Sequence, residues 1–155
     1  MSKSHLGIRC LLLIMIVLVL EACNRQTVEP YVAPDSSYGL IYNKVFSTTC
    51  SLSGCHDGQS ESPLLTGEGA YAAIFNATPS NGQARDTGLL LVKPFDPDSS
   101  FLYQKLIFDS AAFTFGSPMP LGGLTISENA VEFVKQWIEA GAPELGHVAD
   151  RSLIE

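Results

Sequence analysis

Two thiols and an imidazole lie close together in the segment 50–56, which reads CSLSGCH. Four residues separate Cys50 from Cys55, and His56 follows the second cysteine directly. The related pattern C-x-x-C-H marks covalent attachment of haem, in which both thiols add to vinyl groups and the histidine binds the iron. Because the Cys-His junction is intact, the segment predicts the same chemistry. The small serines and Gly54 allow the longer spacer to bulge.

A second iron ligand is predicted at Met119. The chain has three methionines, and Met1 and Met15 lie in an N-terminal segment that we expect to be removed. Met119 stands between Pro118 and Pro120 in a stiff, non-helical loop. A methionine that fills a gap in the core is the alternative, and it suits such a loop poorly. A thioether is a soft iron ligand, and its pairing with histidine raises the potential of haem.

The N-terminus predicts export. Lys3 and Arg9 precede an apolar run over 10–20, which is too short to span a bilayer and matches the hydrophobic part of a signal peptide. The run ends in LEAC at 20–23, which resembles the cleavage site of a bacterial lipoprotein. We expect cleavage before Cys23 and lipidation of its thiol. Secretion with a free Cys23, or an uncleaved anchor, are the alternatives.

The chain divides into four expected parts. They are a signal peptide over 1–22, the lipidated cysteine and a tether over 23–37, a helical domain over 38–143, and a polar tail over 144–155. The tether has no hydrophobic period, and about 14 extended residues reach roughly 45 Å. We expect the domain to face the periplasm or the cell exterior. The outer membrane is preferred, because Asn24 is not the aspartate associated with retention at the inner membrane.

The expected cleavage and lipidation also determine how many cysteines keep a free thiol. With Cys10 removed and Cys23 acylated, only Cys50 and Cys55 remain. In an oxidising compartment these two thiols are able to pair. A haemless exported interaction module with a Cys50–Cys55 disulfide is therefore the main alternative. It leaves the adjoining histidine and the lone methionine of the mature chain without a role.

The net charge indicates which classes of binding partner to expect. The formal net charge is −7, which argues against binding to nucleic acid. An acidic surface suits docking to a basic patch on a redox partner, although many exported proteins are acidic.

Two segments have the apolar spacing of amphipathic helices. The first helix is predicted over 38–47, with Asp35, Ser36 or Ser37 as its cap, and it leads directly to Cys50. Its expected buried residues are Tyr38, Ile41, Tyr42, Val45 and Phe46.

The last helix is predicted to begin after Ser127, with Glu128 in its first turn, and to end at Gly141, before Pro143. Its expected buried residues are Ala130, Val131, Val134, Trp137 and Ile138.

Shorter elements are expected between these helices. They are a helix over 67–75, a surface loop over 78–88, an apolar extended segment over 89–92, and a turn over 93–100 that leads into a helix. Asp98 or Ser99 is the expected cap of that helix, which carries Phe101, Leu102, Leu106 and Phe108. The loop that follows has two aromatic residues, Phe113 and Phe115, which either line a haem pocket or pack on the protein.

Three blocks of the domain together resemble the small c-type cytochromes of bacterial lipoproteins. They are the segments 50–58, 92–103 and 119–142, in the order typical of that family. The resemblance implies an all-α fold of class I type, with the first and last helices packed together around one haem. It implies thioether bonds at Cys50 and Cys55, proximal ligation by His56, and distal ligation by Met119. The implied function is transfer of single electrons between redox partner proteins, without enzymatic activity.

The same residue types also occur in sites with other chemistry. A structural zinc site would use Cys50, Cys55, His56 and His147, but adjacent residues are awkward co-ligands of one tetrahedral ion. A Cys-His nucleophile pair lacks a third group to orient it. A haem enzyme would need an open sixth position, against which Met119 argues. His147 is expected to be a solvated tail residue, and its alternative role is to replace Met119 as the distal ligand.

Overall fold

The computed structural model describes residues 31–107 and 115–155. Within these ranges the chain is helical, and its only β-type pairings are three isolated bridges. The all-α class predicted from the sequence is therefore confirmed. The predicted signal peptide over 1–22, Cys23, Phe108 and Phe113 lie outside the described residues. In the part of the chain that is described, no helix is long and apolar enough to cross a membrane.

The first helical run begins with α2 (Ser37–Ile41) and continues without a break into the π-helical segment η1 (Tyr42–Cys50). Ser36 caps it, because its Oγ accepts the N–H of Gly39 at 3.0 Å. The helix predicted over 38–47 is present and reaches Cys50 itself.

Side-chain hydroxyl groups in and directly after η1 form hydrogen bonds with its main chain. Four of them donate to main-chain carbonyls four or five residues earlier, a contact that competes with regular α-helical bonding. They belong to Ser47, Thr48, Thr49 and Ser51. The polar run before and after Cys50 therefore accounts for part of the departure from α geometry.

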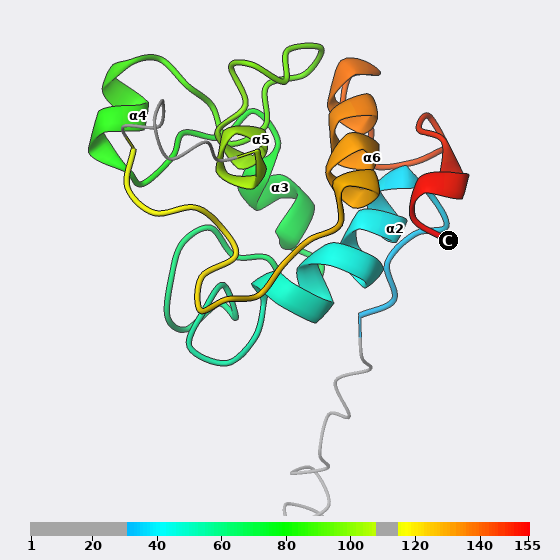
Figure 1. Ribbon diagram of the computed structural model, residues 1–155, viewed down its shortest axis with the longest axis horizontal. Helices are drawn as coiled ribbons and strands as arrows, with labels where there is room; N and C mark the ends of the chain where they lie inside the picture. The colour runs from blue at the N-terminus through cyan, green and yellow to red at the C-terminus, as the bar shows by residue number, and fades with distance from the viewer. Residues whose placement is uncertain (1–30, 108–114) are drawn as a thin grey trace, which may run out of the picture. The chain divides into compact units, whose positions relative to one another are not determined.

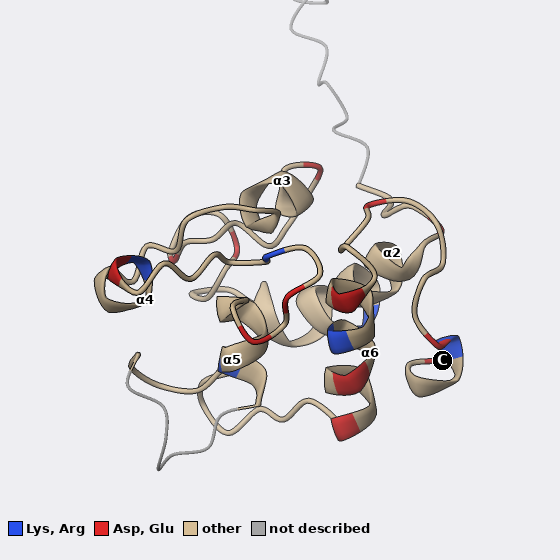
Figure 2. Cartoon of the chain, turned by 90° about the horizontal axis from the view of Figure 1, so that it is seen from above, with Lys and Arg blue, Asp and Glu red and all other residues tan. Residues whose placement is uncertain are grey.

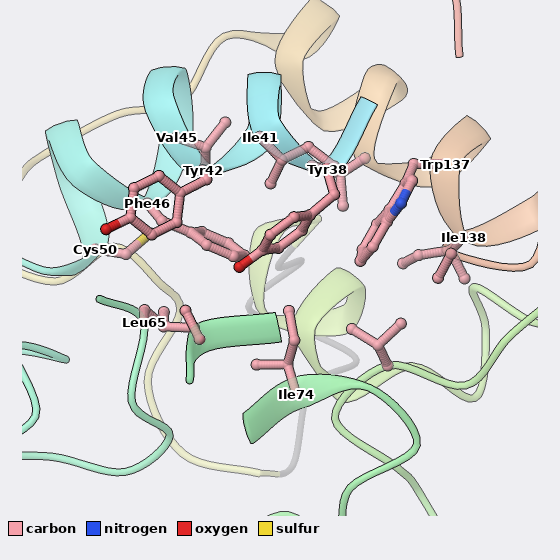
Figure 3. Packing of buried hydrophobic residues seen from close by; sticks show 14 of the residues in the cluster. Tyr38, Ile41, Tyr42, Val45, Phe46, Cys50, Leu65, Ile74, Trp137 and Ile138 are labelled. Carbon is pink, nitrogen blue, oxygen red and sulfur yellow. The ribbon is translucent and has the colours of Figure 1, made fainter. Parts of the chain in front are cut away.

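The core lies between the first helical run and the last helix, α6 (Glu128–Glu139). Figure 1 shows these two helices side by side, with α4 at the other side of the domain. The Tyr38 and Trp137 rings lie 6.0 Å apart, and Figure 3 shows them facing each other within the apolar cluster. All five residues predicted for the stripe of the first helix are buried. Packing of the first helix against the last, predicted from the sequence, is therefore present.

The ends of α6 follow the predicted signals. Ser127 Oγ accepts the N–H of Ala130 at 3.1 Å, and Gly141 follows the helix with a φ of +95°. The predicted stripe is wrong at one position, because Phe133 is fully buried while Val131 is only half-buried. Figure 2 shows acidic and basic positions together along α6, where Lys135 pairs with glutamates one turn away on both sides.

Two predictions for the middle of the chain need correction. The segment 78–88 is not only a loop, because it contains α4 (Gly82–Asp86), which Asn81 caps by accepting the N–H of Ala84 at 2.9 Å. The helix α5 (Phe101–Leu106) begins after Ser100, and neither Asp98 nor Ser99 caps it. Ser100 Oγ instead accepts the N–H of Lys93 at 2.8 Å, which closes the turn that precedes the helix.

The remaining short elements agree with expectation. The helix α3 (Ala70–Ile74) lies within the predicted range 67–75. The extended segment 89–92 forms isolated parallel bridges, Phe75 with Val92 and Leu90 with Ser100.

The tail folds back on the start of the domain. Ser37 donates its main-chain N–H to the carbonyl of Gly146 at 2.9 Å, and its Oγ accepts the N–H groups of Val148 and Ala149. A short 3₁₀ helix, η2 (Arg151–Leu153), follows. The two ends of the described domain therefore lie together.

Candidate functional site

A cavity of about 520 Å³ lies among four segments of the chain. Its walls come from the end of η1 and the loop after it, the region of Asn81 and Leu91, the helix α5, and residues 119–121. The lining is predominantly apolar and includes buried Leu65 and Phe101. Its volume is in the range of cofactor and small-molecule sites.

All four site residues predicted from the sequence line this one cavity. They are Cys50, Cys55, His56 and Met119. The first three come from the segment 50–65, which we call the cysteine loop. Met119 comes from the segment 115–121, which we call the methionine loop. The fold therefore brings together residues that are more than sixty positions apart in the sequence.

A main-chain hydrogen bond closes the cysteine loop. The N–H of His56 donates to the carbonyl of Cys50 at 3.0 Å, and the N–H of Cys55 donates to Leu52 at 2.9 Å. In an α-helical turn, an N–H bonds the carbonyl four residues earlier. A two-residue spacer would place the histidine at that distance from the first cysteine. In this chain the N–H of His56 bonds the carbonyl six residues earlier, so the two extra residues of the spacer bulge out of the turn.

The two thiols differ in burial. Cys50 is 8 % exposed, whereas Cys55 is half-buried, and both are free thiols. Burial raises the pKa of the Cys50 thiol, and the Thr49 hydroxyl at 3.5 Å opposes that shift only in part. Cys55 is therefore the more accessible of the two cysteines.

The imidazole of His56 is oriented by a main-chain carbonyl. Its Nδ1 lies 3.1 Å from the oxygen of Pro63. A carbonyl oxygen only accepts, so this contact requires a proton on Nδ1. In the neutral ring, Nε2 is then left with its lone pair, which is the form that binds a metal ion. Sequence analysis did not single out Pro63, since a carbonyl carries no residue-specific signal.

Asp57 holds the cysteine loop on both sides of His56. Its carboxylate accepts the N–H of Gly54 at 3.1 Å, and the N–H groups of Gln59 and Ser60 at 3.0 Å each. These bonds, that from Gln59 first, lower the pKa of the Asp57 carboxyl. The sequence alone did not mark Asp57 as part of the site. The preference of Asp for bonding nearby main-chain N–H groups is the signal for this further contact.

Met119 is held to α5 through main-chain atoms. Its N–H donates to the carbonyl of Lys105 at 3.1 Å. The ammonium group of Lys105 donates to the carbonyls of Phe115 at 2.9 Å and Ser117 at 2.7 Å. Lys105 also lines the cavity, and sequence analysis did not identify it. A lysine in an amphipathic helix looks like a solvated residue until the loop that it contacts is placed.

Aromatic side chains contribute one wall of the cavity. Phe101 lines it, and the ring of Phe115 packs edge-on against Phe101 at 6.1 Å. Of the two aromatic residues predicted for this region, Phe115 is half-buried against the core, and Phe113 is outside the described ranges. Leu91, from the predicted apolar extended segment 89–92, also lines the cavity.

His147 lies elsewhere. Its Nε2 is 3.2 Å from an oxygen of Asp35, and it is not among the residues that line the cavity. Across the described ranges, no group of three or more His, Cys, Asp or Glu side chains is arranged to hold a metal ion. The Cys2His2 set considered for zinc is therefore not assembled.

Comparison of the chain with models of known protein families found no match. Comparisons with curated proteins and with solved structures likewise found none.

Proposed function

We propose that this chain is an exported monohaem c-type cytochrome that carries single electrons. The observation that supports the proposal most strongly is the gathering of two free thiols, an imidazole and a thioether around one cavity of about 520 Å³. No metal or cofactor is part of the structure, so the fit is judged on the donor set. These groups match a covalently attached haem with His/Met ligation: two thiols for the vinyl groups, and one imidazole nitrogen and one thioether sulfur for the iron.

Each residue has a distinct role in this proposal. The thiols of Cys50 and Cys55 would hold haem through thioether bonds. Nε2 of His56 would bind the iron, because the Pro63 carbonyl fixes the proton on Nδ1. The thioether of Met119, from the methionine loop, would be the second ligand. Haem bound in this way supplies one-electron exchange between Fe(III) and Fe(II).

The protein then tunes and protects the site. The predominantly apolar lining would lower the polarity around haem, and thioether ligation would raise its potential. With His56 and Met119 both as ligands, no ligand position would be left for a substrate, which favours an electron carrier over a haem enzyme. Partners are redox proteins rather than nucleic acid. Lipidation of Cys23 would hold the carrier at a bacterial membrane, facing the periplasm or the cell exterior, with the outer membrane preferred.

The test is a visible spectrum of the full chain produced with haem-maturation machinery and then washed with acidified organic solvent. We expect a haem band that stays with the polypeptide. The His56→Ala variant should lose the low-spin spectrum, whereas His147→Ala, which changes a histidine away from the cavity, should keep it.

Two results would contradict the proposal. Absence of any haem band would leave the exported module with a Cys50–Cys55 disulfide as the better account. A band that is extracted completely would show that haem is bound without thioether bonds.

A further inference from the structure

Lys105 joins three points of the methionine loop to one position of α5. Its side-chain ammonium group donates to the carbonyls of Phe115 at 2.9 Å and Ser117 at 2.7 Å. Its main-chain carbonyl accepts the N–H of Met119 at 3.1 Å. The contacts span the stretch from 115 to 119, so Lys105 contacts both the approach to Met119 and Met119 itself. Asn81 Nδ2 donates to the same Phe115 carbonyl at the longer distance of 3.3 Å.

The environment of Lys105 makes these contacts strong. The ammonium group lies 5.0 Å from the centroid of the Phe101 ring, within the range of a cation–π interaction. Partial burial removes water that would compete for its protons, and the same desolvation lowers the pKa of the group. Hydrogen bonds from a charged donor are worth more than neutral ones, and more again where water is excluded.

Apart from the two prolines that flank Met119, the chain in this region supplies little to fix its own shape. Residues 117–124 contain no helix, and residues 121–124 are exposed. Gly122 and Gly123 both have positive φ, so the chain beyond Met119 depends on glycine conformations with high unfolded-state freedom. The position of the thioether therefore depends on contacts at the N-terminal side of the methionine loop. Lys105 of α5 makes two such contacts, with Phe115 and Ser117.

We propose that Lys105 is the positioning residue of the methionine loop, which holds the thioether of Met119 at the cavity. The role of the thioether as an iron ligand rests on the proposed function. The contacts between Lys105 and the methionine loop do not depend on it. Lys105 does not bind the iron in this proposal. It acts through Met119, and its loss should expose the distal side to other ligands.

The experiment compares the wild-type full chain with Lys105→Ala, with Lys105→Arg, and with Lys44→Ala, which removes an exposed lysine of the first helical run. Three quantities are measured on each. They are the weak far-red band of ferric haem that reports thioether ligation, the affinity for added imidazole, and hydrogen exchange of the main chain over 115–121.

In Lys105→Ala we expect the far-red band to weaken or vanish, and imidazole to bind about tenfold more tightly, because charge-assisted bonds of this kind no longer hold the loop closed. Exchange over 115–121 should rise by about the same factor, while the amides of α6 stay protected. Lys105→Arg should recover most of the wild-type behaviour, because a guanidinium group also donates to two carbonyls. Lys44→Ala should resemble the wild type.

Hydrogen exchange separates this inference from the proposed function. If the chain acquires no haem, the cytochrome proposal fails, yet faster exchange over 115–121 in Lys105→Ala than in the wild type would still support the loop contact. Unchanged exchange and an unchanged far-red band in Lys105→Ala would overturn the inference, even if the wild type proved to be a cytochrome. If Lys105→Ala does not fold, Lys105→Gln keeps most of the side-chain stem and should show the same changes to a smaller degree.

Discussion

The N–H of His56 and the carbonyl of Cys50 are joined by a 3.0 Å hydrogen bond, although five residues lie between them. With a two-residue spacer, an ordinary α-helical turn would make the same bond. The residues between the two cysteines therefore lengthen the loop without changing the relation of the first cysteine to the histidine. Both thiols and the imidazole remain at one cavity.

Shortening the spacer tests this equivalence. A chain that lacks Leu52 and Ser53 has the spacing C-x-x-C-H and should still make the bond from His56 to Cys50. We expect its haem to remain covalently attached through both cysteines, as judged by the mass of the polypeptide after solvent extraction and by the alkaline pyridine spectrum, which shifts when a vinyl group is free. Haem that is retained in the wild type but lost from the shortened chain would contradict the equivalence.

The difference in burial between the two thiols predicts different reactivity. Burial raises the pKa of the Cys50 thiol, so less thiolate is present at a given pH, and access is also restricted. In chain produced without haem attachment, iodoacetamide should modify Cys55 faster than Cys50, and the reaction of Cys50 should need a higher pH. Mass spectrometry of the peptides gives both rates. The difference should disappear in denaturant, and equal rates in the folded chain would count against the burial of Cys50.

The contacts of Asp96 in the turn before α5 predict that the free energy of unfolding depends on pH in the acid range. Asp96 accepts bonds from Lys93 Nζ at 2.8 Å and from the N–H of Ser99 at 3.0 Å, and these lower its pKa from 3.8 to about 2. A lowered folded-state pKa stabilises the protein above the unfolded value, and this stabilisation is lost as the pH falls through the folded value. Asp96→Asn should therefore reduce the free energy of unfolding at pH 7 by no more than ~1 kcal/mol, since the pair is partly exposed.

The difference between wild type and Asp96→Asn should shrink between pH 4 and pH 2, the range set by those two pKa values. Urea denaturation at several pH values measures it. Asp98→Asn is the matched control, because that side chain makes neither of the contacts of Asp96. A difference that stays constant down to pH 2 would show that the carboxylate charge is not its source.

Two tyrosines of the core predict effects of opposite sign. The buried hydroxyl of Tyr38 has no hydrogen-bond partner among the described residues. Figure 3 shows the Tyr38 side chain within the apolar cluster. An unpaired buried hydroxyl is costly, so Tyr38→Phe should raise the free energy of unfolding by ~1 kcal/mol. The hydroxyl of Tyr42 accepts the N–H of Gly67 at 3.0 Å, and Tyr42→Phe should lower stability by a similar amount. Thermal or urea denaturation of both variants decides the matter, and destabilisation by Tyr38→Phe would point to a partner for its hydroxyl.

Local signals made the long helices predictable. Ser127 and Gly141 mark the ends of α6 because each acts within one turn of its own position, by capping and by a positive φ respectively. The stripe of the first helix was predictable because burial of one face imposes a period that a sequence displays directly. Clustering of Met119 with the cysteines followed from chemistry, since the sequence offers no geometric link between positions 55 and 119.

What sequence reasoning missed depends on contacts between distant segments. The tail packs on the domain because Ser37 accepts N–H groups more than a hundred positions away, and a polar tail carries no pattern that reveals this. The ammonium group of Lys105 bonds a main-chain carbonyl of the methionine loop, and the main-chain carbonyl of Pro63 contacts His56. Main-chain atoms are the same in every residue, so they carry no signal in the sequence. The π-helical turns of η1 likewise combine hydroxyl bonding with tertiary packing, so period alone predicted only a helix.

The helical run from Ser37 to Cys50 also acts as a spacer. Its first residue is joined to the tail near Gly146, and its last residue opens into the cavity, which places these two ends on the order of 20 Å apart. The run therefore separates the contact that joins the two ends of the described domain from the cavity, and the tail and the cavity lining have no residue in common.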